Sequence, residues 1–98
     1  MTIRDEQYPL LVEFMSKFLY QLAAPAFEEA ILGWTAQGPD EVRRLIHEID
    51  RALAAGHTNE ELETFISQHS DYGCESGHMT LTYFRNVLAE WLVNALRG

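Results

Sequence analysis

Residues 38–66 read GPDEVRRLIHEIDRALAAGHTNEELETFI and predict two consecutive helices. Gly38 and Pro39 interrupt the preceding element, and a proline is well accommodated in the first turn of the next helix. The apolar residues that follow recur at helical spacing and form one stripe: Val42, Leu45, Ile46, Ile49 and Leu53. The pattern predicts a helix over about residues 40–55, with Asp40 and Glu41 in its first turn, where negative charge suits the helix dipole.

The second helix of this stretch has its own start signals. Gly56 is typical of the left-handed residue that closes a helix. Thr58 and Glu61 have the spacing of a capping box, in which each side chain accepts a hydrogen bond from the other residue's backbone. The inward residues are Leu62, Phe65 and Ile66. A helix over about residues 58–68 is therefore expected.

Three further helices flank this pair. One begins at Tyr8 or Pro9 and is broken by Pro25, because a residue before proline is pushed out of the helical region. The next covers about residues 26–36, and the last follows Thr80 as its N-cap and ends near Arg97. Their apolar stripes are Leu10, Leu11, Phe14, Met15, Phe18, Leu19 and Leu22, then Phe27, Ala30, Ile31 and Trp34, then Leu81, Phe84, Leu88, Trp91, Leu92, Ala95 and Leu96.

No strand pattern competes with these helices. The chain of 98 residues is therefore predicted to be all-α, a single-domain bundle of four to five short helices. Residues 1–7 are polar and are expected to fray.

The charge balance restricts the class of partner. Seven Lys and Arg residues stand against fifteen Asp and Glu residues, which gives a net charge of -8. Such a chain is not expected to bind nucleic acid or anionic membranes, which attract basic surfaces. A basic protein partner fits better, with fast and salt-dependent association. The alternative is that the acidity only keeps the protein soluble.

The compartment is predicted from three features. Cys74 is the only cysteine, so no internal disulfide can form, as in a reducing compartment. The N-terminus lacks the basic start and apolar core of a signal peptide. No apolar run reaches the length of a membrane span. A cytoplasmic protein is expected.

Residues 69–79, HSDYGCESGHM, are expected to form a loop that lacks apolar periodicity. His69, Asp71, Cys74 and His78 are all of metal-ligand type, but this spacing alone does not define a zinc site, and neither a metal nor a cofactor is predicted. Cys74 beside a histidine lacks the third orienting group of a thiol nucleophile, so an inert thiol and a protein without enzymatic activity are expected.

Several segments of the chain resemble the small immunity proteins of contact-dependent growth inhibition systems. The resemblance covers roughly residues 8–96. It rests on FMSKFLYQ (14–21), a helix with Glu28 and Glu29, EVRRLIHEIDRALAAG (41–56), TNEELETFI (58–66) and TLTYFRNVL (80–88).

This resemblance implies a cytoplasmic, non-catalytic protein that binds the C-terminal toxin domain of its matching secreted protein in a 1:1 complex and blocks the active site. The toxin is expected to be a basic nuclease, with an RNase as the leading expectation. An acidic helical adaptor for another basic protein is the alternative. Two patches are the candidates for contact, one in the predicted loop and one on the predicted second helix, and their residues are Asp71, Tyr72 and Glu75, and Glu28, Glu29 and Trp34. Trp34 fits the apolar stripe but lies near a helix end, where an exposed ring can anchor a partner.

Overall fold

The computed structural model describes residues 3–18, 27–69 and 76–97, and these residues form helices and no strand. The five α-helices and two short 3-10 helices are, in order, η1 (Asp5–Gln7), α1 (Pro9–Phe18), α2 (Phe27–Gly33), η3 (Trp34–Gln37), α3 (Pro39–Ala54), α4 (Asn59–His69) and α5 (Gly77–Arg97). The predicted all-α class is confirmed.

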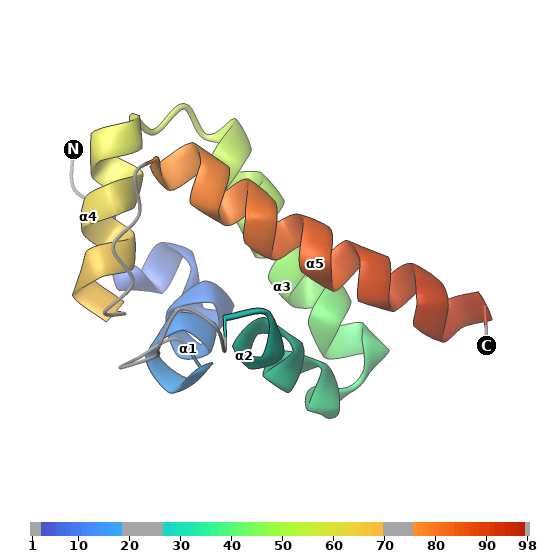
Figure 1. Ribbon diagram of the computed structural model, residues 1–98. Coiled ribbons are helices and arrows are strands. Elements are labelled where there is room, and N and C mark those ends of the chain that lie inside the picture. The colour runs from blue at the N-terminus through green and yellow to red at the C-terminus, as the bar shows by residue number, and fades with distance from the viewer. Residues whose placement is uncertain (1–2, 19–26, 70–75, 98) are drawn as a thin grey trace.

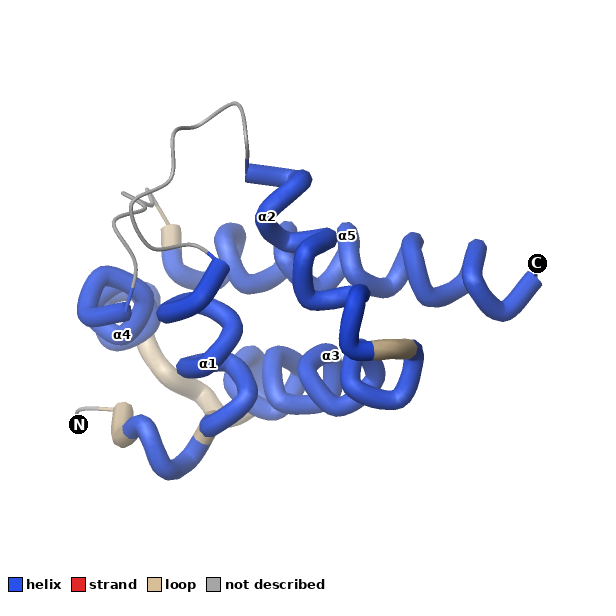
Figure 2. Tube along the Cα trace, turned by 90° about the horizontal axis from the view of Figure 1, so that it is seen from below, coloured by secondary structure: helices blue, strands red, loops and turns tan. Residues whose placement is uncertain are grey.

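Helices α3 and α5 form the centre of the bundle (Figure 1). They lie side by side and run in opposite directions (Figure 1), and an ion pair of 2.6 Å joins Asp50 Oδ1 in α3 to Arg85 Nε in α5. Helix α4 crosses one end of the α3–α5 pair (Figure 2). Helices α1 and α2 pack against one side of the same pair (Figure 2). The last turns of α5 project beyond the bundle (Figure 1).

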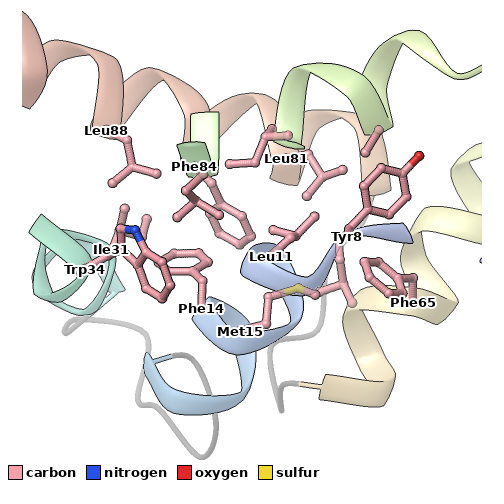
Figure 3. Close-up of a cluster of buried hydrophobic side chains, with 14 of the residues drawn as sticks. Tyr8, Leu11, Phe14, Met15, Ile31, Trp34, Phe65, Leu81, Phe84 and Leu88 are labelled. Carbon is pink, nitrogen blue, oxygen red and sulfur yellow. The ribbon is translucent and has the colours of Figure 1, made fainter. Parts of the chain in front are cut away.

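The core lies where α1 and α2 meet the α3–α5 pair (Figure 3). Phe14 of α1 is fully buried at its centre, and its ring makes edge contacts with Trp34 at 5.9 Å and with Phe84 at 5.6 Å between centroids. Further fully buried large side chains come from α1, α2, α3 and α4: Phe65, Leu11, Met15, Ile31, Leu45, Ile49, Leu62 and Ile66. Helix α5 adds Leu81 and Leu88, which are also fully buried. The stripes predicted for α3 and α4 thus supply the core.

The helix signals of residues 38–66 are confirmed in detail. Gly38 and Gly56 have φ angles of 102° and 82°, which side-chain-bearing residues rarely adopt. The capping box is complete, since Glu61 N donates to Thr58 Oγ1 at 3.1 Å and Thr58 N donates to Glu61 Oε1 at 2.9 Å. Local sequence alone therefore sets both ends of the α3–α4 connection.

Several predicted boundaries differ from the structure. The helix predicted to reach about residue 36 is α-helical only to Gly33 and continues as η3. Helix α5 begins at Gly77, and Ser76 caps it, because Met79 N donates to Ser76 Oγ at 3.3 Å. Thr80, the predicted N-cap, is instead a buried residue of the first turn. The N-terminal segment was expected to fray, but residues 5–7 form η1 and Ile3 is buried.

Glu48 is a buried carboxylate in the middle of α3, and it completes the start of α1. Its Oε1 accepts hydrogen bonds from Leu10 N at 2.9 Å and Leu11 N at 3.1 Å, and its Oε2 lies 3.2 Å from Leu10 N. These amides are among those that a helix leaves unpaired at its N-terminus. Burial raises the pKa of Glu48 above its ordinary value of 4.5, against the opposing effect of these backbone hydrogen bonds. Glu48 thus fixes α1 to α3.

Glu48 should make stability depend on pH in a defined direction. Because its pKa is raised in the folded protein, the proton is held more tightly than in the unfolded chain, so its contribution is present below pH 4.5 and is lost as pH rises through the folded-state pKa. Urea unfolding from about pH 4 to about pH 7 should show the wild type losing stability relative to Glu48→Gln as pH rises. A wild type whose stability relative to Glu48→Gln stays constant or increases as pH rises would contradict this assignment.

Candidate protein-binding surface

Helix α4 is the most one-sidedly charged helix of the structure. It carries three glutamates, Glu60, Glu61 and Glu63, and neither lysine nor arginine. Helix α5, by contrast, has two arginines, Arg85 and Arg97, and a single acidic residue. The net charge of -8 is therefore distributed unevenly, with an excess of carboxylates at the end of the bundle that α4 forms.

The carboxylates of α4 are held outward by its packing and its cap. Leu62 and Phe65 are buried against the core, which leaves Glu60 exposed and Glu63 half-buried. The backbone N–H of Thr58 donates to Glu61, and this bond lowers the pKa of the Glu61 carboxyl below its ordinary value of 4.5.

The N-terminal segment extends this surface along α4. Asp5 Oδ1 lies 2.8 Å from His69 Nε2 at the end of α4, and Tyr8 makes an edge contact with Phe65 at 6.1 Å. Between the segment and α4 lies a hollow of about 180 Å³ that is lined by both apolar and polar residues. Its lining is Ile3, Thr58, Glu60, Glu61, Thr64, Phe65 and Gln68. This acidic end, defined by Asp5, Glu6, Glu60, Glu61 and Glu63, is the candidate protein-binding surface.

Of the residues predicted on the second helix, only Glu29 is seen at the surface. Glu28 lies in α2, and its side chain is outside the described part of the chain. Trp34 is fully buried, and its Nε1 donates to the Glu41 carbonyl at 3.2 Å. The stripe interpretation of Trp34 is thus confirmed, and its ring is not available as a surface anchor.

Asp71, Tyr72 and Glu75 lie outside the described residues, as does Cys74. The segment that holds them joins His69, at the end of α4, to Ser76, at the start of α5. Asp71 and Glu75 are therefore close in sequence to the acidic end, and their contribution to it stays a prediction.

The two histidines of the predicted loop have separate partners. His69 contacts Asp5, while His78 Nδ1 and the His78 backbone N–H both contact Asn59 Oδ1 of α4. Over residues 3–18, 27–69 and 76–97, no three His, Cys, Asp or Glu side chains are grouped so as to hold a metal ion.

A second surface feature was not predicted. Between α3 and α5 lies an apolar groove of about 360 Å³, lined by Ile46 and Leu92 and by Arg43, Arg44 and His47. The predicted inward stripe of α5 continued to Leu96, but Leu96 is 59% exposed, because α5 projects past its neighbours there.

Among the described helices, none has both the length and the apolar character needed to cross a membrane.

In comparisons with known proteins, no family model, curated protein or solved structure matches this chain. The chemistry of the described surface is therefore the basis on which a function can be proposed.

Proposed function

We propose that this chain is an immunity protein that binds the C-terminal toxin domain of its matching contact-dependent growth inhibition protein and blocks the toxin's active site. The resemblance in sequence suggests the family, and the acidic end of the bundle is the observation that carries the proposal. Helix α4 alone contributes three negative charges and no lysine or arginine. Asp5 and Glu6 lie beside α4, and the basic residue closest to these two in sequence is Arg4.

An acidic surface of this kind suits a nuclease as its target. A nuclease binds the phosphates of its substrate through lysine and arginine side chains. Carboxylates fixed on a rigid helix can pair with the same cations, and the complementary charge speeds the encounter of the two proteins. Binding of this type inhibits the toxin without any chemical step in the immunity protein.

The hollow beside α4 gives this surface a place for one basic side chain. A lysine or arginine of the toxin can lay its aliphatic stem along Ile3 and Phe65, which line the hollow. Its cation can then pair with Glu60, which also lines the hollow. Because the capping box fixes the start of α4 in the free protein, little ordering is needed when the toxin binds.

The direct test is a binding titration with the toxin domain encoded immediately upstream of this gene, at low and at high salt. A 1:1 complex of nanomolar affinity or tighter, together with loss of toxin activity, is expected, and the association rate should fall steeply with salt. Absence of binding would overturn the immunity proposal for that pair and leave an adaptor for another basic protein as the better explanation.

Reversing two charges of α4 should slow toxin binding. The double variant Glu60→Lys, Glu63→Lys is expected to reduce the association rate at low salt by at least about tenfold, with a much smaller effect at high salt. The control variant Asp40→Lys, Glu90→Lys changes the net charge equally but lies toward the opposite end of the bundle. Stopped-flow kinetics at nanomolar concentrations should show a clear difference between the two variants. Equal slowing in both would mean that overall charge acts, rather than this surface.

A further inference from the structure

The outward face of α5 carries large apolar side chains that the bundle does not cover. Within the described residues, the exposed large hydrophobic side chains all belong to this helix: Met79, Tyr83, Val93 and Leu96. Val93 and Leu96 are 50% and 59% exposed, and they lie in the turns that project beyond the bundle (Figure 1). Half or more of each side chain thus meets solvent on a rigid helix.

The apolar groove between α3 and α5 is continuous with this projecting end. Leu92 lines the groove together with Ile46, and Leu96 follows Leu92 one turn later on the same side of α5. Arg43 and Arg44 line the same groove. An exposed leucine therefore lies next to a groove that can take a leucine.

From this self-complementary arrangement, we propose that the face binds a second copy of the chain. The C-terminal halves of two α5 helices pack antiparallel across a two-fold axis near Val93. Leu96 of each copy enters the groove of the other copy, over Ile46 and Leu92. A symmetric pair uses the same patch on both molecules, so both exposed leucines and both grooves are covered at once.

Charge complementarity favours this occupant and this orientation. Glu90, Val93 and Arg97 share one face of α5, since they are three and four residues apart. Neither Glu90 nor Arg97 forms an ion pair with another described residue. The antiparallel arrangement places Glu90 of one copy opposite Arg97 of the other, twice in the dimer. A parallel arrangement would place Glu90 against Glu90 and Arg97 against Arg97, which is unfavourable.

The end of α5 itself also suits the groove of the other copy. The C-terminal end of a helix carries a partial negative charge from its unpaired carbonyl groups. In the proposed dimer this end meets Arg43 and Arg44, which line the groove. Two chains that each carry a charge of -8 repel one another, so they are expected to meet away from the carboxylates of α4.

The dimer should be weak and concentration-dependent, because the overlap of two helix ends is small compared with the roughly 800 Å² that each partner buries in a standard interface. Sedimentation equilibrium of the full chain from about 1 μM to about 1 mM should show a monomer–dimer equilibrium. Leu96→Lys is expected to raise the dissociation constant by at least about tenfold, because it places a positive charge beside Arg43 and Arg44 in the groove of the other copy.

A matched control distinguishes binding through this face from nonspecific association of the exposed apolar residues of α5. Met79 is 75% exposed on the same helix, away from the projecting end, so Met79→Lys makes the same kind of change and should leave dimerisation unaltered. A wild type that stays monomeric over the whole range would overturn the proposal. So would a Leu96→Lys variant that dimerises like the wild type, or a Met79→Lys variant that weakens the dimer equally.

A charge exchange tests the orientation. Glu90→Arg and Arg97→Glu should each weaken the dimer, and the double variant should restore it, since each reversed residue again meets an opposite charge. Failure of the double variant to recover would exclude the antiparallel arrangement. The proposed dimer does not depend on the immunity function, since toxin binding through α4 uses the other end of the bundle.

Discussion

Replacing Trp34 with alanine is expected to lower the free energy of unfolding by about 3–5 kcal/mol, a large share of the 5–15 kcal/mol typical of a domain. The indole is fully buried in the core, where its ring contacts Phe14 edge-on at 5.9 Å between centroids. Its Nε1 also donates to the Glu41 carbonyl at 3.2 Å, a bond that joins η3 to the first turn of α3. Urea unfolding of the two proteins measures the loss.

The variant Trp34→Phe provides the control. Phenylalanine keeps much of the aromatic volume and loses the hydrogen bond, so its loss should be clearly smaller than that of alanine. Toxin affinity of the folded Trp34→Phe protein should equal that of the wild type, because the ring is not at the surface. A loss of affinity without a loss of stability would show that Trp34 contacts the toxin after all.

The second large effect is expected at Gly77, where α5 starts against α4. A Cβ at this position would lie 2.4 Å from Leu62 Cβ, 2.9 Å from the Asn59 carbonyl oxygen and 2.9 Å from Glu63 N. Two of these atoms belong to the backbone of α4, so α4 and α5 must move apart to admit a methyl group. Gly77→Ala is therefore expected to destabilise the protein by about 3 kcal/mol in urea unfolding.

The sign of the stability change in Gly77→Ala shows which of two effects is larger, the close contact with α4 or the higher helix propensity of alanine. Alanine in a helix is ordinarily favoured over glycine by about 1 kcal/mol, so an open site at Gly77 would give a more stable protein. Gly56→Ala serves as the comparison, since nothing lies within 4 Å of the place that its methyl group would occupy, and only the φ of 82° opposes the change. Its loss should be about 1 kcal/mol. A Gly77→Ala protein as stable as the wild type would contradict the close approach of α4 and α5.

The sequence predicts those elements whose signals are local. The α3–α4 connection is set by Gly56, Thr58 and Glu61, which act on their immediate neighbours, and the structure agrees there. The start of α5 was placed at the wrong residue because Ser76 and Thr80 both resemble N-caps. Asn59 of α4 decides between them by accepting the hydrogen bond from His78 N at 3.1 Å. This contact joins residues nineteen positions apart, which no local pattern reveals.

The surface was harder to predict than the core for a related reason. Periodicity shows which side of a helix is apolar, but it does not show how far the neighbouring helices extend. Leu96 was therefore predicted to be a core residue, whereas in the structure α5 projects past α3 at this position and Leu96 is exposed. Glu48 resembled an ordinary polar residue beside the stripe, because its role depends on the amides of α1. The overall acidity and the glutamates of residues 60–63 were visible in the sequence, whereas the position of Asp5 beside the end of α4 required the fold.

The bonds from Glu48 to Leu10 and Leu11 also bear on the order in which the chain becomes structured. Helix α1 has ten residues, too few to be stable alone in water, and its first amides lack their acceptor until α3 exists. During synthesis, residues 9–18 leave the ribosome long before residue 48 does. Helix α1 therefore depends on a later part of the chain, and its apolar side chains stay open to other proteins during that interval.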